Sequence, residues 1–258
     1  MMYDSLKGKI ALVTGGTKGI GKSIADKLSA NGVTVVITAR SKSEDASNNH
    51  HFIAADLTRA DSAGRIAKEV LEKYGKIDIV VNNAGANLSP GGGFNTLEDE
   101  DWSKDWELNF MSVVRMNKAL LPAMLEQKEG IIINISTGAA KQPIWEMTMS
   151  YSSAKAALNA YSKALANEVG PKGIRVNTVS PGVVRTPLMN DFIENIAQRS
   201  GTTFEESFQS IVDKVGVPIG RMAEPEEIAN MVAFLASSEG QYITGANISI
   251  DGGASPTV

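Results

Sequence analysis

Tyr151 and Lys155 are the residues of this chain whose types and spacing most directly suggest catalysis. They lie four residues apart at the beginning of a helix-forming segment, so both side chains share one helix face. A phenol that exchanges protons near neutral pH needs a lowered pKa, worth roughly 4 kcal/mol. One positive charge at ~4 Å in an effective dielectric of ~20 supplies about that free energy. The pair therefore predicts that Tyr151 is a general acid or base and that Lys155 lowers its pKa.

A glycine-rich turn follows the first apolar segment of the chain and opens a helical segment. Glycines let the backbone turn tightly and approach a pyrophosphate, which sits at the N-terminus of the following helix. At the first junction between a strand and a helix, we expect a dinucleotide site rather than a mere corner of the chain. The candidate binding residues in this turn are Gly15, Thr17, Lys18, Ile20 and Gly21.

The end of the second apolar segment indicates which nicotinamide cofactor is bound. An acidic residue there would bind the ribose 2'-hydroxyl and repel a 2'-phosphate, but this chain has Arg40 and no carboxylate. Together with Lys18, Arg40 favours NADP in preference to NAD, and Ser41 adds a hydroxyl donor. The alternative is that Arg40 is a solvated loop residue.

Asp56 closes the third predicted strand and is followed by Leu57. Its carboxylate is a candidate acceptor for the adenine amino group, with Leu57 packing nearby. The alternative is that Asp56 caps the helix predicted over residues 60–74.

Seven short segments are predicted as strands, because most are apolar throughout, as in strands covered on both faces. They are residues 10–13, 33–38, 52–55, 77–81, 131–135, 175–179 and 247–250. Helices are predicted between them, over residues 20–31, 60–74, 102–127, 151–169 and 225–237. This alternation predicts one Rossmann-type α/β domain, a doubly wound parallel sheet of about seven strands with helices on both faces.

Two segments depart from the regular alternation. Residues 41–49 are polar with no apolar stripe, so a loop or a single turn is expected between the second and third strands. Residues 187–216 carry apolar residues at loosely helical spacing, which predicts one or two helices hinged over the pocket as a substrate lid. A structural helix pair that packs on the core is the alternative.

Composition limits the classes of partner. The chain has 258 residues, 43% of them hydrophobic, a net charge of -4 and a pI of about 5.4. These values suggest neither a nucleic-acid nor a membrane-surface partner, since both need clustered basic charge. With no cysteine, and with His50 and His51 lacking patterned carboxylates, no metal site is expected. No signal peptide and no run of ~18 apolar residues is evident, so a cytoplasmic protein is expected.

From Lys7 to Gly253 the chain resembles the short-chain dehydrogenase/reductase family in its single-domain form. The matching motifs occur in family order: the Thr14–Gly21 turn, Asp56-Leu57, Asn82–Gly85, Asn109, Ser136/Thr137, Tyr151 with Lys155, Pro181–Thr186, and the C-terminal segments 242–245 and 251–253. The resemblance implies an NADP(H)-dependent oxidoreductase that transfers a hydride between the nicotinamide and a small-molecule ketone or secondary alcohol. It also implies a homotetramer or homodimer, formed through the helices at 102–127 and 151–169.

The resemblance further implies residue roles. Tyr151 would be the acid in carbonyl reduction, Lys155 would hold the nicotinamide ribose, and Asn109 would bind, through its backbone or its amide, a water that relays protons to Lys155. Further cofactor contacts are implied for Asn83, Ala84 and Gly85 beside the adenosine ribose, and for Pro181, Gly182, Val184 and Thr186 around the nicotinamide. For Asn83 to Gly85, the alternative is a strand end that merely ties neighbouring backbone together.

The hydroxyl that would orient the substrate oxygen belongs to Ser136 or Thr137. The family has a serine thirteen positions before its tyrosine, where this chain has Gly138. Counted from the predicted strand 131–135, Thr137 takes the expected place, and it is slightly favoured here. Ser136 has the family's residue type, but alternation along a strand would turn it away from the site.

Two groups of aromatic residues remain. Trp145, shortly before Tyr151, predicts an apolar or bulky substrate wall, or packing against a neighbouring subunit. Trp102 and Trp106 are spaced i, i+4, which indicates a buried face or a subunit interface.

The alternative function is a catalytically weak nucleotide-binding sensor or scaffold protein of the same fold. The displaced serine favours this alternative, whereas the presence of both Tyr151 and Lys155 opposes it.

Overall fold

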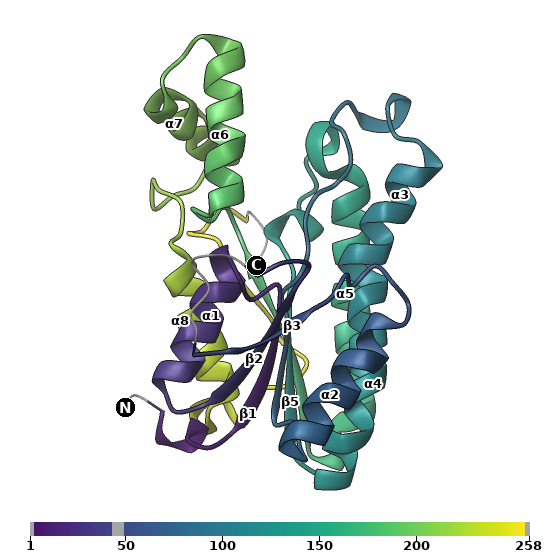
Figure 1. The fold of residues 1–258 in the computed structure, drawn as a ribbon. Helices are drawn as coiled ribbons and strands as arrows, with labels where there is room; N and C mark the ends of the chain where they lie inside the picture. Colours follow the sequence, from purple (N-terminus) through teal and green to yellow (C-terminus); the bar gives the residue numbers. More distant parts are fainter. Residues whose placement is uncertain (1–2, 43–48, 256–258) are drawn as a thin grey trace.

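Seven parallel strands form one sheet in the computed structural model, which describes residues 3–42 and 49–255 (Figure 1). The order is β3-β2-β1-β4-β5-β6-β7. The strands are β1 (Ile10–Thr14), β2 (Thr34–Ala39), β3 (His51–Ala54), β4 (Ile79–Asn82), β5 (Gly130–Ile135), β6 (Ile174–Pro181) and β7 (Asn247–Ile250). The doubly wound seven-strand sheet is therefore confirmed. Its winding reverses between β1 and β4, and sheets of this type bind ligands at the carboxyl ends of strands at that point.

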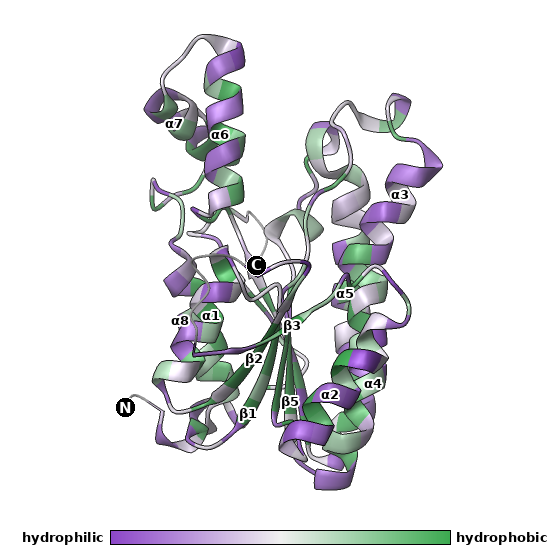
Figure 2. Ribbon diagram, viewed as in Figure 1, coloured by the Kyte–Doolittle hydropathy of each residue, from purple (hydrophilic) through white to green (hydrophobic). Residues whose placement is uncertain are grey.

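Helices cover both faces of the sheet (Figure 1). One face carries α1 (Gly19–Ala30) and α8 (Pro225–Ala236), and the other carries α2 (Ser62–Tyr74), α4 (Ser112–Gln127) and α5 (Trp145–Val169). Side chains alternate between the faces along a strand, so Val13 belongs to the first core and Leu12 to the second. Figure 2 shows the resulting hydrophobic strands between the helical layers.

The helix predicted over 102–127 is divided into three parts. Helix α3 (Asp99–Trp106) is followed by a π-helical turn (Glu107–Met111) and then by α4. Helix α5 also differs from its prediction, because it begins at Trp145 and has non-helical backbone angles at Thr148. Both irregularities fall next to predicted site residues, and departures of this kind from a regular helix are frequent at functional sites.

The segment 187–216 forms two helices, α6 (Pro187–Ser200) and α7 (Phe204–Val215). The predicted helix pair is confirmed, and it projects beyond the carboxyl edge of the sheet (Figure 1). Its buried apolar residues form a cluster of their own around Ile193 and Val212. The pair therefore does not pack on the central core, and the alternative of a structural helix pair on that core is wrong.

His50 and His51 lie where the chain enters β3, and each is paired with a carboxylate. His50 is buried, with its Nε2 2.9 Å from Asp26 Oδ1 on α1. His51 begins β3, and its Nε2 lies 3.1 Å from Glu69 Oε1 on α2. The polar partners on two helices explain the burial. Most of the preceding loop predicted over 41–49 lies outside the described residues.

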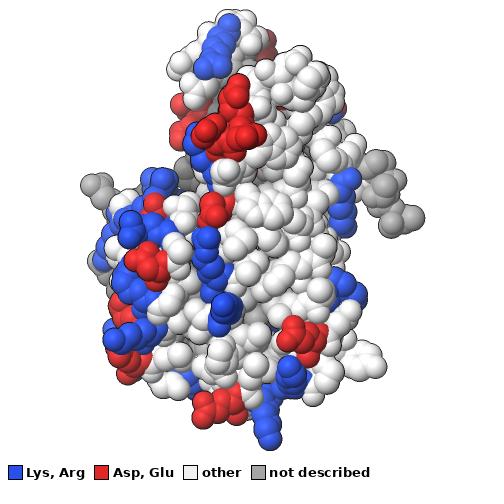
Figure 3. All heavy atoms as spheres, turned by 90° about the vertical axis from the view of Figure 1, so that its right-hand side faces the viewer, with Lys and Arg blue, Asp and Glu red and all other residues white. Residues whose placement is uncertain are grey.

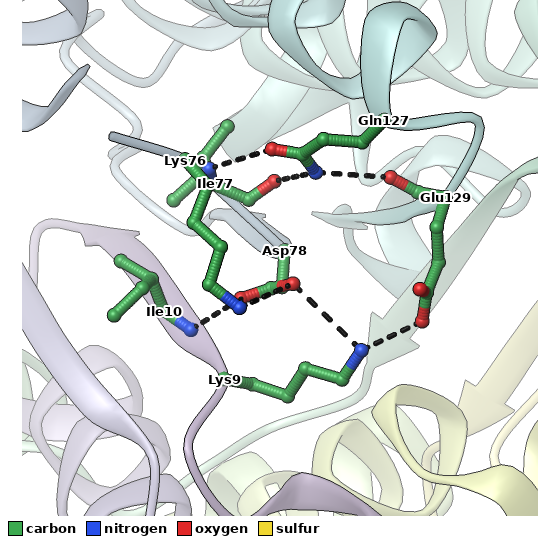
Figure 4. A network of polar contacts seen from close by, with 7 residues as sticks. All are labelled: Lys9, Ile10, Lys76, Ile77, Asp78, Gln127 and Glu129. Carbon is green, nitrogen blue, oxygen red and sulfur yellow. Dashed lines mark hydrogen bonds and ion pairs between the residues drawn. The ribbon is translucent and has the colours of Figure 1, made fainter. Parts of the chain in front are cut away.

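Asp78 organises the amino edge of the sheet, opposite the glycine-rich turn. Its carboxylate accepts a hydrogen bond from Ile10 N at 2.7 Å and lies 3.0 Å from Lys76 Nζ and 3.7 Å from Lys9 Nζ (Figure 4). Gln127, at the end of α4, bonds both backbone groups of Ile77. This cluster joins β1, β4 and α4, so its charged side chains stabilise the fold.

Across residues 3–42 and 49–255, every helix is too short or too polar to cross a bilayer.

Candidate active site

The glycine-rich turn forms a closed backbone cradle between β1 and α1. Gly15 has a φ of 65° and donates its N–H to Thr38 O at 2.7 Å. A Cβ on Gly16 would lie 2.6 Å from the Ile37 side chain, and one on Gly21 would collide with the Gly15 carbonyl. The first turn of α1 carries no acidic residue, so its N–H groups face no negative charge of their own. These residues fit a pyrophosphate group.

Arg40 and Ser41 directly follow β2, and both are exposed, as is Lys18 in the turn after β1. Because β1 and β2 are parallel neighbours, the two cations lie at the same edge of the sheet. Arg40 is close enough to Asp56 to help lower the pKa of that carboxyl, after the larger effect of hydrogen bonds from Thr58. Cationic side chains at this edge fit the 2'-phosphate of NADP.

Asp56 does not cap the following helix, so that alternative is wrong. Its Oδ1 accepts hydrogen bonds from Thr58 N at 3.0 Å and from Thr58 Oγ1 at 2.8 Å, which closes a local turn. Helix α2 begins only at Ser62. Leu57 packs against the core on the α2 side of the sheet.

The segment after β4 joins the glycine-rich turn to the catalytic pair. Asn83 Nδ2 donates to Thr14 O at 2.9 Å and to Gly15 O at 3.2 Å. Its side chain therefore does tie neighbouring backbone together, as the alternative proposed. Gly85 has another constraint, since a Cβ there would lie 3.0 Å from Lys155 Nζ. It would also lie 2.8 Å from Asn109 Oδ1, so Gly85 leaves room for two predicted catalytic side chains.

Tyr151 and Lys155 lie within α5, but the pKa of the tyrosine is raised rather than lowered. Burial raises the pKa of Tyr151 to about 12, although a hydrogen bond with the Thr137 hydroxyl opposes this. Burial also lowers the pKa of Lys155 to about 8, and its Nζ donates to Ile135 O at 2.8 Å. The lowered pKa predicted for the phenol is therefore wrong. Burial disfavours the phenolate form of Tyr151 and the ammonium form of Lys155 alike.

Thr137, rather than Ser136, is brought to the tyrosine. The Thr137 hydroxyl is close enough to Tyr151 to oppose the rise in the tyrosine pKa, and it accepts a hydrogen bond from Ala139 N at 3.2 Å. Ser136 is 5% exposed, and its Oγ is buried with no hydrogen-bond partner among the described residues. Alternation at the end of β5 thus points the two hydroxyls in different directions. The geometry favours Thr137 as the orienting hydroxyl.

Asn109 lies in the π-helical turn and is fully buried. Its amide donates to Ala86 O at 2.8 Å and to Asp105 O at 3.0 Å, and its Oδ1 accepts from Ala86 N at 3.1 Å. The side chain is therefore committed to the backbone. Of the two predicted routes to a water molecule, only the Asn109 main chain is left.

The segment after β6 returns to the glycine-rich turn. Gly182 donates its N–H to Ile250 O at 3.0 Å, and Val184 is buried beside Ala223. Thr186 caps α6, accepting from Met189 N at 3.2 Å. A Cβ on Gly19 would lie 3.2 Å from Thr186 Cγ2, so Pro181–Thr186 and the dinucleotide cradle border one space.

Large apolar side chains are exposed on the loop of residues 86–95, at the start of α5 and on α6. The loop of residues 86–95 packs on the start of α5, where Gly92 N donates to Glu146 O at 2.8 Å. This wall carries Leu88, Phe94 and Trp145, which are 47%, 77% and 60% exposed, and α6 contributes Leu188 and Phe192, at 67% and 37%. These five residues are called the apolar rim below. For Trp145, the substrate wall and the contact with a neighbouring subunit both stay predictions.

Trp102 and Trp106 are 39% and 42% exposed, so they do not form a buried face of this chain. Trp106 contacts Phe110 with a centroid distance of 4.6 Å. The face that carries α3, α4 and α5 shows a broad area without charged side chains (Figure 3). Of the two predictions for this pair, only the subunit interface is left.

One residue of the site was missed by the sequence reasoning. Asp105 is fully buried and accepts hydrogen bonds from Ser150, the residue before Tyr151, and from Ser89. In the sequence it stands among the acidic residues of 98–107 and reads as part of a solvated face. Its spacing of four residues before Asn109 was the one available signal.

Comparison with known proteins places the chain among reductases. Residues 15–255 match the family model described as enoyl-(acyl carrier protein) reductase. The chain is 36% identical to the 3-oxoacyl-[acyl-carrier-protein] reductase FabG of Vibrio cholerae, over 96% of this chain and 98% of that protein. It is also 36% identical to the acetoacetyl-CoA reductase of Allochromatium vinosum, over 95% and 98%. The L-sorbose reductase of Gluconobacter frateurii, solved with NADPH and L-sorbose, has a TM-score of 0.94 and 33% identity, with full coverage of both chains.

Proposed function

Because this chain belongs to the short-chain dehydrogenase/reductase family, we propose that Tyr151, Lys155, Thr137 and Asn109 form its reaction centre. The chain is an NADP(H)-dependent oxidoreductase that acts on ketones and secondary alcohols. NADPH supplies the hydride when it is bound. The protein's task is to hold the carbonyl group and to provide the proton that its oxygen needs.

The Tyr151 phenol donates that proton. A neutral phenol is the acid that carbonyl reduction needs, and burial keeps Tyr151 protonated at neutral pH. The Thr137 hydroxyl, close to Tyr151, hydrogen-bonds the substrate oxygen and orients it. The ammonium group of Lys155, with a pKa of about 8, returns a proton to the phenol, with the Asn109 carbonyl holding the intervening water.

The other proposed cofactor contacts follow the geometry described above. The cradle residues Gly15, Thr17, Ile20 and Gly21 hold the pyrophosphate, and Lys18, Arg40 and Ser41 hold the 2'-phosphate. Asp56, Leu57 and Asn83–Gly85 lie on the adenosine side, and Pro181, Gly182, Val184 and Thr186 lie on the nicotinamide side. The lack of room for a Cβ at Gly16 and Gly21 is what supports this arrangement most directly.

The substrate that we propose is a ketone with an apolar chain, of the 3-oxoacyl thioester class. The observation that carries this proposal is the apolar rim, in which large side chains remain 37–77% exposed at the proposed mouth of the site. Exposed apolar groups of this size gain free energy when an acyl chain covers them, about 25 cal/mol per Å². A sugar ketone gains little from such a rim.

NADPH consumption tests this function directly. Acetoacetyl-CoA and longer 3-oxoacyl thioesters should be reduced with a higher kcat/KM than L-sorbose. The Tyr151→Phe variant should lose nearly all turnover while its affinity for NADPH stays close to that of the wild type. A variant that kept its turnover would contradict the proposed acid, and a preference for the sugar would contradict the substrate class.

The sensor or scaffold alternative loses its main support. It rested on the displaced serine, and the Thr137 hydroxyl lies close enough to Tyr151 to affect its pKa.

We further propose a homotetramer or homodimer in the cytoplasm. The uncharged area over α3, α4 and α5, with Trp102 and Trp106 partly exposed, supports an interface between copies (Figure 3). A sequence without cysteine suits a reducing compartment. We also propose that residues 1–258 act as one domain, in which α6 and α7 close over the substrate as a lid. Light scattering of the wild type and of Trp106→Glu would test the interface.

A further inference from the structure

Trp145, the first residue of α5, packs against the backbone of Gly93 on one side and remains open on the other. A Cβ built on Gly93 would lie 3.0 Å from Trp145 Cε3 and 3.1 Å from Cζ3, so the indole lies directly against this glycine. The residue is nevertheless 60% exposed. Part of the ring is therefore held by the protein, and the larger part faces outward.

Three consecutive glycines make this close packing possible. Gly92 and Gly93 have φ values of 121° and 73°, and a Cβ on Gly92 would collide with the Thr96 side chain. A Cβ on Gly91 would lie 2.9 Å from Glu146 O, the carbonyl that accepts a hydrogen bond from Gly92 N at 2.8 Å. The turn thus needs glycine both for its backbone angles and for its contact with the start of α5.

The loop that carries this turn begins beside the proposed reaction centre. It follows Gly85, which lies close to the amine of the catalytic pair. Further along, Ser89 Oγ lies 2.8 Å from the hydroxyl of Ser150, the residue before Tyr151. Trp145 precedes Tyr151 by six residues, or about 9 Å along a helix. The loop and the start of α5 therefore form one wall that leads from the reaction centre to the indole.

The first turn of α5 is itself fixed at several points. Thr148, where the helix is interrupted, donates from Oγ1 to Ile144 O at 3.1 Å and accepts from Ile144 N at 3.2 Å. Asn87 Nδ2 donates to Met147 O at 2.7 Å. The backbone that carries Trp145 is thus held from within the helix and from the loop.

An aromatic ring that is already held in place loses little conformational entropy when a ligand covers it. The contact partner of the held side is a glycine, so the apolar ring needs an apolar group to cover its open side. Helix α6, which carries Leu188 and Phe192 of the apolar rim, lies on the other side of the carboxyl edge of the sheet (Figure 1). A hydrocarbon chain that extends from the reaction centre along the wall fits this arrangement.

We propose that Gly93 is a positioning residue that holds Trp145 as a platform for the acyl chain of the substrate, so that this pair sets the preference for chain length. The inference rests on the proposed function, which supplies the reaction centre and the 3-oxoacyl class. The acyl group of acetoacetyl-CoA ends before the platform, whereas a longer chain covers the indole. Covering about 60 Å² of apolar surface is worth about tenfold in kcat/KM.

Binding of octanoyl-CoA, a thioester without the 3-oxo group, tests the platform without turnover. The chain has three tryptophans, so 5-fluorotryptophan gives few ¹⁹F NMR signals, and Trp145→Phe assigns the one needed. In the presence of NADP⁺, octanoyl-CoA should shift the Trp145 signal and CoA alone should not. A signal that ignores octanoyl-CoA would overturn the platform. So would a signal that changes only when the protein is diluted, because that result identifies a contact with a second copy.

Gly93→Ala tests the positioning role. Its Cβ must displace the indole, so kcat/KM for a long-chain 3-oxoacyl-CoA should fall about three- to tenfold, while that for acetoacetyl-CoA stays within about twofold. Gly64→Ala is the matched control, because a Cβ on Gly64 meets nothing within 4 Å, and it should change neither value. Adding Gly93→Ala to Trp145→Ala should cause no further loss, since the Cβ then has room.

Equal losses for the two thioesters in Gly93→Ala would overturn the positioning role. Losses that add in the double variant would do the same, because they would come from strain in the turn rather than from the indole. Failure of the proposed function has a different signature: the wild type would reduce neither thioester, or Tyr151→Phe would keep its turnover, whatever the ¹⁹F signals show.

Discussion

Replacing Lys155 by methionine should stabilise the free protein at neutral pH while abolishing its proposed activity. Lys155 is 2% exposed, and burial lowers its pKa from an ordinary 10.5 to about 8. At pH 7 the folded chain therefore holds a charged amine against a penalty of about 3 kcal/mol. Methionine has a similar length and avoids this penalty, but it leaves Ile135 O without its donor, at a cost of about 1 kcal/mol. The net gain should be about 2 kcal/mol in the free energy of unfolding.

The dependence on pH identifies the cause of the gain. Between pH 8 and 10.5 the unfolded chain binds more protons at Lys155 than the folded chain does, so wild-type stability rises with pH in that window. The variant lacks this rise, and its advantage should shrink to about zero near pH 10. Contributions from the other titrating groups are common to both proteins and cancel in the difference.

Urea unfolding at pH 7, 8.5 and 10, without added nucleotide, measures the difference. Lys118→Met is the control, because Lys118 is exposed on α4 and its replacement should change stability by no more than about 0.5 kcal/mol. A Lys155→Met variant no more stable than the wild type at pH 7 would refute the reasoning. So would an advantage that stayed constant as the pH rose.

Three further predictions concern cofactor, substrate orientation and substrate size. Arg40→Asp should raise the KM for NADPH about 10- to 100-fold, because a charge-assisted hydrogen bond to phosphate is lost, while the KM for NADH changes little in the same assay. Thr137→Val should lower kcat/KM about 100-fold through the loss of the orienting hydroxyl, and Thr137→Ser should keep most of it. Ser136→Ala should have less effect than either, and equal losses at both positions would leave the orienting residue undecided between them. Trp145→Ala should raise KM for a long-chain 3-oxoacyl thioester several-fold more than for acetoacetyl-CoA, since only the longer chain reaches the apolar rim. Equal effects on the two thioesters would show that Trp145 lies outside the substrate path.

Periodicity and turn residues were enough to determine the layers of the fold. Apolar segments of four to six residues, separated by helical segments, leave few solutions other than a parallel sheet covered on both faces. The glycine-rich turn, the cationic end of the second strand and the Tyr151–Lys155 pair were visible because each follows from local sequence. The helix boundaries were less well predicted, because neither the π-helical turn nor the break at Thr148 follows from hydrophobic periodicity.

Burial and distant partners were decided only by the tertiary structure. The spacing of four residues placed Lys155 beside Tyr151. The pKa of the Tyr151 phenol, however, also depends on burial and on groups that follow β5 or lie on α3, which the spacing cannot reveal. Thr137 and Ser136 are adjacent in sequence, and only the end of β5 separates their directions. The sequence alone suggests that Asp105 is a surface acid. In the structure, two serine hydroxyls and a backbone amide from other segments donate hydrogen bonds to its carboxylate. A local pattern fixes which face of an element a side chain occupies, whereas its charge state depends on everything packed against that face.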